Sequence, residues 1–259
     1  MRNPHGTPIW YEYHALDADR AQAFYEAVFG WQVAPSGDVA GLDYRIVTTR
    51  DGVGLAGLMP LMAGMPQTPG WLFYVGVDDV DATIATAQDA GGTVRMPATD
   101  MPGVGRMALL ADPDGHMFYL MRGAMDEPSR AFVTPPDTTP GQMVWNELTT
   151  VDQDAALAFY AQLFGWRHER ELPMGPLGAY RFVHVGDTCI GATMPVVPGG
   201  APGWLFYAEV EDIDAAIARA IDGGGALAQG PDPIPSDAFS AVVTDPDGAR
   251  IGLVGPRRG

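Results

Sequence analysis

The chain has 259 residues, of which 47% are hydrophobic and 18% are charged, so it is long enough for two compact domains and has a globular composition. Its formal net charge of -17 argues against nucleic acid or an anionic membrane as a partner, because both attract positive charge. No apolar run is long enough to span a membrane and the first residues lack the apolar core of a secretory signal, so we expect a cytoplasmic protein.

Three sequence blocks occur twice, in the same order. WYEYHALDADRAQAFYEAVFGW at 10–31 returns as WNELTTVDQDAALAFYAQLFGW at 145–166, an offset of 135 residues. The block PGWLFYVGVDDVDATIATAQDAGG that starts at residue 69 has its counterpart at residue 202, and ADPDGHMFYLM at 111–121 returns as TDPDGARIGLV at 244–254. We infer a duplicated domain, with domain 1 at 1–122 and domain 2 at 143–259. The stretch 123–142 between them is rich in Pro, Thr and charge, which predicts a linker.

Each copy is expected to contain the same short elements. In the first copy a strand at 10–16 precedes a helix that Asp17 or Asp19 can cap and that Gly30 ends. The elements expected after it are strands at 31–34, 44–49 and 53–59, a strand at 72–77, a helix at 79–90, and strands at 93–96, 106–110 and 117–121. Each Asp-Pro-Asp-Gly segment predicts a hairpin turn. Strands outnumber helices and most sequential pairs can be antiparallel, so the predicted fold class is α+β.

This order of elements, with the Asp-x-Asp…Phe-Tyr…Phe-Gly-Trp block and the Asp-Pro-Asp-Gly hairpin, resembles the vicinal oxygen chelate superfamily. That superfamily includes glyoxalase I, extradiol dioxygenases, and the bleomycin and fosfomycin resistance proteins, and the resemblance covers nearly the whole chain. It implies two tandem glyoxalase-like domains, each built from two paired βαβββ modules that form a curved, mostly antiparallel sheet around a cavity. It also implies a divalent metal that chelates two neighbouring oxygens of a substrate.

The metal-ligand positions that the resemblance implies are occupied by residues that do not bind metals. The positions of the first-strand His or Gln, the His before the second helix, and the Glu after the hairpin are, for the two copies, Trp10 and Trp145, Leu72 and Leu205, and Tyr119 and Gly252. The strand that carries a fourth Glu in some members reads GLAGLMP and CIGATMP here, without a carboxylate. These side chains do not coordinate a divalent cation as imidazole and carboxylate do. We therefore expect no metal and no other cofactor.

Side chains two apart on a strand share a face, so the same positions identify the expected cavity linings. The expected lining in domain 1 is Trp10, Glu12, His14, Leu72, Tyr74, Met117, Tyr119 and Met121. The expected lining in domain 2 is Trp145, Glu147, Thr149, Leu205, Tyr207, Glu209, Arg250 and Val254. A mostly apolar lining with a few polar groups is typical of a small-molecule site.

The polar members of these linings allow more than one role. Glu12 and Glu147 are the acids that both copies place there, and a carboxylate among Trp, Leu and Tyr suits ligand contact or proton transfer. The alternative is a structural role, in which each carboxylate accepts hydrogen bonds from backbone or tyrosine. His14 is a candidate base or metal ligand, or a packed histidine, and Thr149 takes its place in the second copy. Arg250 offers a forked donor to an anionic ligand, or an ion pair with a neighbouring acid.

The leading functional hypothesis is a protein that binds a small apolar or aromatic molecule without a metal, in one or both domains. It resembles most the bleomycin-resistance branch of the superfamily, and sequestration or sensing is the expected activity. The alternative is an enzyme, a glyoxalase-like lyase or an oxygenase, that uses Glu12 or Glu147 as a base. A third possibility is a scaffold protein whose cavities have become core. The expected partner is the small molecule alone, and the chain is a monomer or a homodimer.

Overall fold

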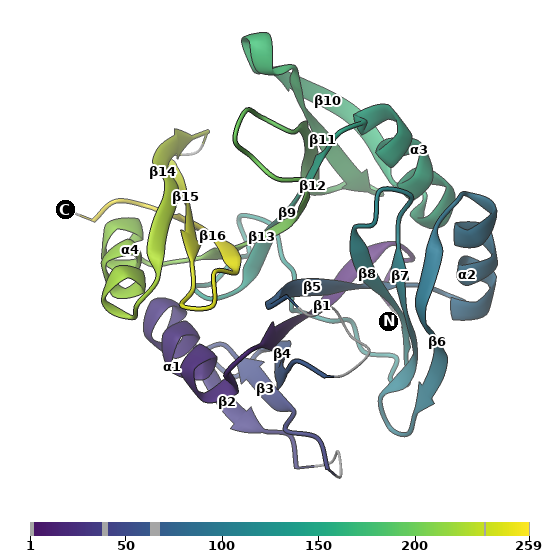
Figure 1. Ribbon diagram of the computed structural model, residues 1–259, viewed down its shortest axis with the longest axis horizontal. Helices are drawn as coiled ribbons and strands as arrows, with labels where there is room; N and C mark the ends of the chain where they lie inside the picture. Colours follow the sequence, from purple (N-terminus) through teal and green to yellow (C-terminus); the bar gives the residue numbers. More distant parts are fainter. Residues whose placement is uncertain (1–2, 38–40, 63–67, 236, 259) are drawn as a thin grey trace. The chain divides into compact units, whose positions relative to one another are not determined.

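The computed structural model describes residues 3–37, 41–62, 68–235 and 237–258, and Figure 1 shows the mixture of helices and strands in this part of the chain. The elements of the first repeat are β1 (Thr7–Ala15), α1 (Ala18–Phe29), β2 (Gln32–Pro35), β3 (Arg45–Thr48), β4 (Gly54–Pro60), β5 (Gly70–Gly76), α2 (Val80–Asp89), β6 (Thr93–Met101), β7 (Gly105–Ala111) and β8 (Met117–Gly123). The order strand, helix, three strands therefore occurs twice, and the predicted α+β class is confirmed.

The second repeat has the same order, with one additional 3-10 turn, η1. Its elements are β9 (Met143–Thr150), α3 (Gln153–Phe164), β10 (Arg167–Pro173), η1 (Gly175–Leu177), β11 (Ala179–Val185), β12 (Thr188–Pro195), β13 (Gly203–Glu209), α4 (Ile213–Asp222), β14 (Ala226–Ile234), β15 (Ala238–Thr244) and β16 (Arg250–Gly255). None of the described helices combines the length and the apolar character that crossing a bilayer requires.

Aspartate N-caps determine where the α-helices begin. The side chain of Asp17 accepts a hydrogen bond of 3.0 Å from the backbone N–H of Arg20, so Asp17 is the cap of α1. Asp19 lies in the first turn, where a negative charge interacts favourably with the helix dipole. Gly30 ends α1 in the left-handed conformation, with φ of 70°. The other α-helices begin in the same way, after Asp79, Asp152 and Asp212.

Each repeat contributes one open sheet of eight strands. The strand order is β2-β3-β4-β1-β5-β8-β7-β6 in the first sheet and β10-β11-β12-β9-β13-β16-β15-β14 in the second. In the first sheet β2, β3 and β4 pair antiparallel, as do β6, β7 and β8, whereas β1–β4 and β5–β8 are parallel. The second sheet shows the same pattern. Antiparallel pairs therefore predominate, as expected.

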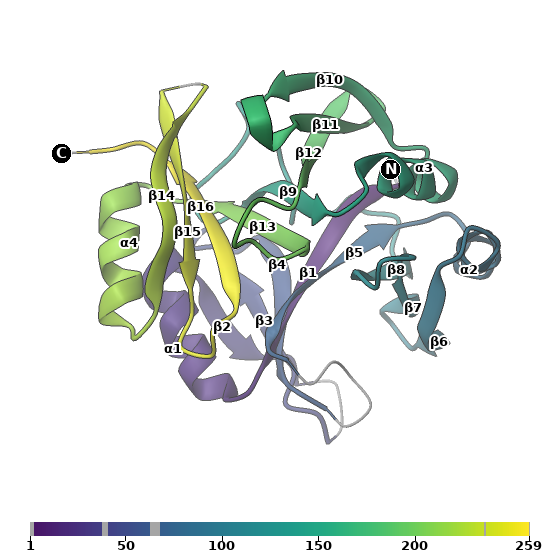
Figure 2. The same ribbon diagram turned by 45° about the horizontal axis from the view of Figure 1, so that its top comes forward.

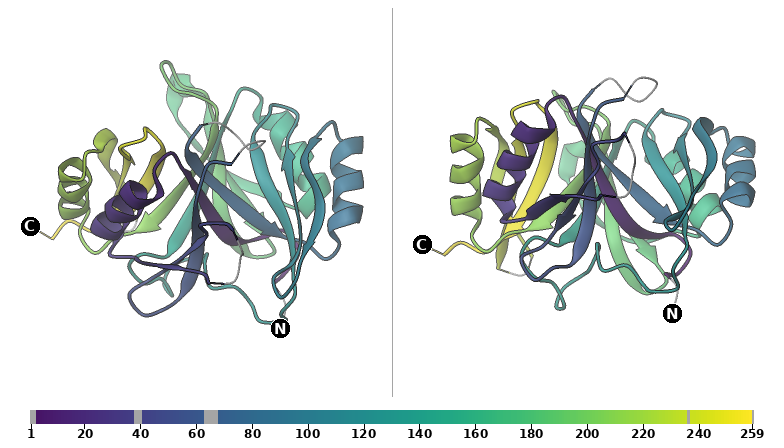
Figure 3. Two further views of the ribbon diagram at one scale, coloured as in Figure 1. Left: turned by 60° about the horizontal axis from the view of Figure 1, so that its bottom comes forward. Right: turned by 90° about the horizontal axis from the view of Figure 1, so that it is seen from below.

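Compactness divides the described chain into two units, and each unit takes segments from both repeats. The first unit comprises Met1–Ile9, Leu72–Ser129 and Asn146–Trp204; the second comprises Trp10–Trp71, Arg130–Trp145 and Leu205–Gly259. In the first unit α2 packs on β6, β7 and β8 and contacts α3; in the second, α4 packs on β14, β15 and β16 and contacts α1 (Figures 2 and 3). Each unit combines segments from both repeats, so these units do not test the domain boundaries at 122 and 143, which stay a prediction.

A buried aspartate–tyrosine hydrogen bond joins the two repeats inside the first unit. Asp112 begins the hairpin turn of the first repeat, and its side-chain Oδ2 accepts a hydrogen bond of 3.0 Å from the hydroxyl of Tyr160 in α3. Its Oδ1 accepts from the backbone N–H groups of Asp114 and His116, which closes the turn. The Tyr160 ring packs edge-on against Phe118 of β8. One carboxylate therefore shapes the hairpin and holds α3 against it.

The second unit contains the same arrangement with the two repeats exchanged. Oδ2 of Asp245 accepts a hydrogen bond of 2.9 Å from the Tyr25 hydroxyl of α1 and another from the Tyr13 hydroxyl of β1. Its Oδ1 accepts from the backbone N–H groups of Asp247 and Ala249 at 2.9 Å each. Burial raises the pKa of both phenols well above the ordinary tyrosine value, and the Asp245 charge adds to this, so both hydroxyls remain donors.

The tryptophan that closes each Phe-Gly-Trp block makes a second contact between repeats. The Nε1 of Trp166 donates to the carbonyl of Gly6, and the Nε1 of Trp31 donates to the carbonyl of Gly141, each at 2.8 Å. Gly6 has a φ of 87°, and a Cβ at this position would lie 2.7 Å from the carbonyl oxygen of Phe164. Glycine is therefore needed for the chain to come this close to α3.

We expect Tyr25→Phe and Tyr160→Phe each to lower the free energy of unfolding by about 1.5–3 kcal/mol, the usual contribution of a hydrogen bond to a charged group. The ring and its packing stay in place, so the loss reports the hydroxyl alone. Equilibrium unfolding in urea measures the change. Unfolding midpoints equal to that of the unmodified protein in both variants would contradict the role of the aspartate–tyrosine bonds.

Stability should also fall at alkaline pH. The phenols of Tyr13, Tyr25 and Tyr160 have raised pKa values in the folded chain, because they are buried beside negative charges. Tyrosines in the unfolded chain lose their protons near the ordinary value of about 10, so above that pH the unfolded state binds fewer protons than the folded state. The stability that these phenols contribute is therefore complete below about pH 10 and is lost as the pH rises further. Urea unfolding between about pH 8 and pH 11 checks this, and a flat profile would oppose it.

Candidate functional site

Glu12, His14, Tyr44 and Trp10 form a hydrogen-bonded cluster in the second unit, here called the Glu12 cluster. Glu12 and His14 lie two residues apart on β1 and are 3% and 2% exposed. The Nε2 of His14 is 2.8 Å from Oε1 of Glu12, and the Tyr44 hydroxyl donates to Oε2 of Glu12 at 3.2 Å. The Nε1 of Trp10 donates to the Tyr44 hydroxyl at 3.2 Å. Both oxygens of the buried carboxylate are thus contacted from within the cluster.

A glycine on the neighbouring strand makes room for Tyr44. Strands β1 and β4 are parallel, and Glu12 is paired with Gly57. A Cβ at Gly57 would overlap the hydroxyl of Tyr44, so any larger residue would displace the phenol. Burial raises the pKa of Tyr44 well above its ordinary value, and the charge of Glu12 raises it further. The phenol therefore stays protonated and donates to the carboxylate.

The second repeat has the carboxylate and the phenol but not the imidazole. In the first unit, the Tyr180 hydroxyl donates to Oε2 of Glu147 at 2.7 Å, and Glu147 is 8% exposed. The residue that corresponds to His14 is Thr149: His14 pairs with Met59 of β4, and Thr149 pairs with Met194 of β12. The Glu–Tyr pair is therefore common to both repeats, whereas the imidazole belongs to the first.

Tyr44 and Tyr180 are absent from the candidate residues that the sequence indicates. A signal for them exists, because the dipeptide Tyr-Arg at 44–45 recurs at 180–181. Its offset is 136 residues, one more than that of the block containing Glu12 and Glu147, so it lies outside the register of the repeats found first. Periodicity along one strand also does not say which carboxylate a distant phenol meets.

In the first unit Tyr119, at one of the positions where the resemblance implies a metal ligand, stacks on Tyr74. Tyr74 of β5 and Tyr119 of β8 are paired in the parallel register, and their rings stack at 4.2 Å with an interplanar angle of 7°. Both are buried, at 3% and 2% exposure. Leu72 and Met117, which the sequence places on the same strands, are partly buried. This part of the first unit is aromatic and apolar.

In the second unit a tyrosine covers the position of the missing Glu. Tyr207 of β13 is paired with Gly252 of β16, and a Cβ at Gly252 would overlap the Tyr207 ring. Tyr207 belongs to a buried apolar cluster whose other members are Val144, Leu205 and Val242, with Trp145 and Val254 packed against it. The structure thus brings Trp145, Leu205 and Tyr207 together. Arg250 is exposed at the start of β16.

The residues at the expected metal-ligand positions do not fit a divalent cation. Trp10, Leu72 and Leu205 present no oxygen or unprotonated nitrogen, and Gly252 has no side chain. The phenol of Tyr119 is stacked on Tyr74 and carries neither carboxylate nor imidazole. Among the residues that the structure describes, no three His, Cys, Asp or Glu side chains form a group that could hold a metal ion.

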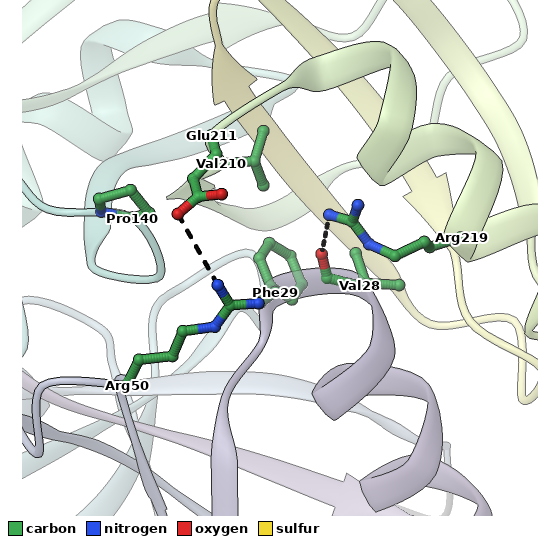
Figure 4. Close-up of a pocket in the computed structure, with 7 residues that line it drawn as sticks. All are labelled: Val28, Phe29, Arg50, Pro140, Val210, Glu211 and Arg219. Atoms are coloured by element: carbon green, nitrogen blue, oxygen red, sulfur yellow. Dashed lines mark hydrogen bonds and ion pairs between the residues drawn. The ribbon is translucent and has the colours of Figure 1, made fainter.

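A small hollow in the second unit is lined by other residues, among them Phe29, Arg50 and Arg219 (Figure 4). Its volume of about 30 Å³ has room for about one water molecule. Arg219 of α4 donates to the Val28 carbonyl near the end of α1 at 2.9 Å, and Arg50 lies 3.7 Å from the carboxylate of Glu211. The Arg219 contact satisfies a carbonyl of the last turn of α1, so the hollow belongs to the helix end and is too small for an organic ligand.

Curated proteins of similar length resemble the chain over nearly its whole extent. "Putative glyoxylase CFP32" of Mycobacterium tuberculosis (strain CDC 1551 / Oshkosh) is 34% identical over 255 residues, which cover 97% of this chain and 95% of the relative. "Anthracycline biosynthesis protein DnrV" of Streptomyces peucetius is 32% identical over 270 residues, which cover 98% of this chain and 94% of the relative.

Solved structures share the fold at low sequence identity. The Mn(II)-bound glyoxalase from Novosphingobium aromaticivorans has a TM-score of 0.69 at 18% identity, with 99% of this chain and 84% of that chain covered. The 2,2',3-trihydroxybiphenyl 1,2-dioxygenase from Sphingomonas wittichii strain RW1 has a TM-score of 0.68 at 15% identity, with 97% and 90% covered. These two likenesses concern the fold alone.

The family assignment rests on both halves of the chain. The family model described as "Glyoxalase/Bleomycin resistance protein/Dioxygenase superfamily" matches residues 10–120 and, a second time, residues 142–253. The two matches correspond to the two repeats and their two eight-stranded sheets. The chain belongs to the glyoxalase/bleomycin resistance protein/dioxygenase superfamily.

Proposed function

We propose that this protein binds a small, mostly aromatic or apolar molecule in one or both of its glyoxalase-like domains, without a metal. The observation that carries this proposal is that the expected metal-ligand positions hold indole, aliphatic and stacked phenol side chains, or none at Gly252, in place of imidazole and carboxylate. Each unit combines such an apolar group with one carboxylate–tyrosine pair, Tyr74–Tyr119 with Glu147–Tyr180 in the first unit and the Tyr207 cluster with Glu12–Tyr44 in the second. Apolar surface with a few fixed polar groups is what a small-molecule site requires.

The chemistry of the pairs favours a ligand with a hydroxyl group on an aromatic framework. A buried carboxylate is a strong acceptor, and the tyrosine that donates to it fixes its orientation. Aromatic side chains stack on planar rings, which adds affinity beyond the area buried. The relative that is named an anthracycline biosynthesis protein supports a planar, hydroxylated ring system as the first class to examine.

A second function, an enzyme that transfers protons, is favoured by the Glu12 cluster. A carboxylate 2.8 Å from an imidazole is an arrangement that general acid–base catalysis uses. The relative named a putative glyoxylase supports the same reading, in which a glyoxalase-like lyase or an oxygenase employs Glu12 or Glu147 as its base. The same residues could orient a bound ligand or transfer its proton. The binding protein and the enzyme are therefore distinguished by whether a product is formed.

Binding is tested by thermal unfolding of the protein with an anthracycline aglycone, in buffer that contains EDTA. We expect a ligand at about 100 times its Kd to stabilise the fold by about 2.7 kcal/mol, because it binds the native state alone. Glu12→Gln or Glu147→Gln should weaken binding about tenfold through loss of a charge-assisted hydrogen bond. Glu169→Gln, on the exposed strand β10, is the matched control and should leave binding unchanged.

Two outcomes would oppose the proposal. Binding that disappears in EDTA and returns with Mn²⁺ would contradict metal independence. Failure of the aglycone and of a wider panel of hydroxylated aromatic compounds to stabilise the protein would remove the binding function. Product formed in EDTA from methylglyoxal–glutathione hemithioacetal or from a catechol, and lost in Glu12→Gln, would instead establish the enzyme.

A further inference from the structure

The two repeats differ in chemistry at one buried position of their first strands. His14 in β1 and Thr149 in β9 occupy the same place in the parallel register, beside Met59 and Met194. The second repeat forms the same strand, the same neighbouring strand and the same Glu–Tyr pair with threonine at this position. The fold therefore does not depend on an imidazole there, although a buried carboxylate–imidazole pair is costly to desolvate.

The contacts of the Glu12 cluster assign a role to each of its groups. Tyr44 is buried and has a raised pKa, so its hydroxyl donates to Glu12 and stabilises the carboxylate form. A carboxylate in turn accepts a hydrogen bond from the protonated nitrogen of a neutral imidazole, and Nε2 of His14 is the nitrogen at 2.8 Å. A neutral imidazole that donates from Nε2 to a carboxylate carries its lone pair on Nδ1.

We propose that His14 is a proton-accepting group specific to the first repeat, that Glu12 and Tyr44 are its positioning residues, and that its ligands carry an acidic proton, as phenols and enolisable ketones do. This rests on the proposed small-molecule binding and goes beyond it, because it distinguishes the repeats and makes the imidazole, rather than Glu12, the base. In the second repeat, Glu147 and Tyr180 hold a ligand without accepting its proton.

The proton transfer balances within the site. The O–H or C–H bond of the ligand breaks and its electron pair remains on the ligand, as phenolate or enolate. The lone pair of Nδ1 forms the new N–H bond, and the ring becomes an imidazolium. The Glu12 carboxylate compensates the positive charge, just as a buried carboxylate stabilises the imidazolium of a hydrolase triad. No metal or redox partner takes part in this step.

The ligand-free protein offers the first test, by long-range proton–nitrogen NMR of the histidine rings. The chain has five histidines, and the signal of His14 is the one that disappears in His14→Thr. This variant copies the residue that the second repeat has at the corresponding position, and circular dichroism checks that it is folded. We expect His14 to be protonated on Nε2 and bare on Nδ1 near neutral pH, and Glu12→Gln to remove this preference. An Nδ1-protonated or a doubly protonated ring would overturn the proposal whether or not any ligand binds.

The second test uses 4-nitrophenol, whose ionised form absorbs visible light, at about one pH unit below its own pKa. In water about a tenth of the probe is ionised there, and we expect the fraction to rise about fivefold on the protein. His14→Thr should return it to the value in water, whereas His168→Thr, on the exposed strand β10, should not change it. Thermal stabilisation by the probe reports binding separately. Binding without ionisation would overturn this proposal and leave the proposed function intact, and no stabilisation at all would overturn the phenol class.

Discussion

The carboxylates of Asp112 and Asp245 are buried, and each accepts a hydrogen bond from a tyrosine that belongs to the other repeat. Each also accepts hydrogen bonds from two backbone N–H groups of its own hairpin, so the turn and the helix contact depend on the same carboxylate. A buried carboxylate is tolerated only when its oxygens are satisfied, and Asp245 in the second unit accepts hydrogen bonds from four donors. The packing of α1 and α3 follows from this constraint.

These contacts do not involve the side chains of Glu12 and Glu147, and the first strands of the two repeats, β1 and β9, differ in the residues beside these carboxylates. The same Glu–Tyr pair stands on β1 and β9, in the first case with an imidazole beside it and in the second without one. Near the positions where the family resemblance implies imidazole and carboxylate ligands, the structure has stacked tyrosines and a buried apolar cluster. A shared framework with different side chains is consistent with a duplication after which the two copies changed separately.

Local chemistry made much of the fold predictable. The aspartate cap of α1, the glycine that ends it and the Asp-Pro-Asp-Gly turns depend on residues close in sequence, and the structure has them where the sequence indicates. The repeat predicted the order of the elements without any knowledge of pairing. The choice between Asp17 and Asp19 as cap needed the structure, because both residues suit the first turn of a helix.

The candidate site was less predictable, because its contacts join distant residues. Strand alternation places Glu12 and His14 on one face of β1, and in the structure they lie 2.8 Å apart. It did not indicate that Tyr74 stacks on Tyr119. It gave no indication of Tyr44, which reaches Glu12 across 32 positions and depends on a glycine in a third segment. The predicted turn role of the Asp-Pro-Asp-Gly segments was confirmed but incomplete. No residue near Asp112 in the sequence indicates that its carboxylate accepts a hydrogen bond from the hydroxyl of Tyr160.

The exchange of tyrosines between repeats also bears on how such a chain arises. Half of the protein, taken alone, has an aspartate without its phenol and a phenol without its aspartate, so it is complete only beside a second copy of itself. Gene duplication and fusion convert that association from one that depends on concentration into one within a single molecule. After fusion the copies no longer need to be identical, and a histidine in one and a threonine in the other become compatible with a single stable fold.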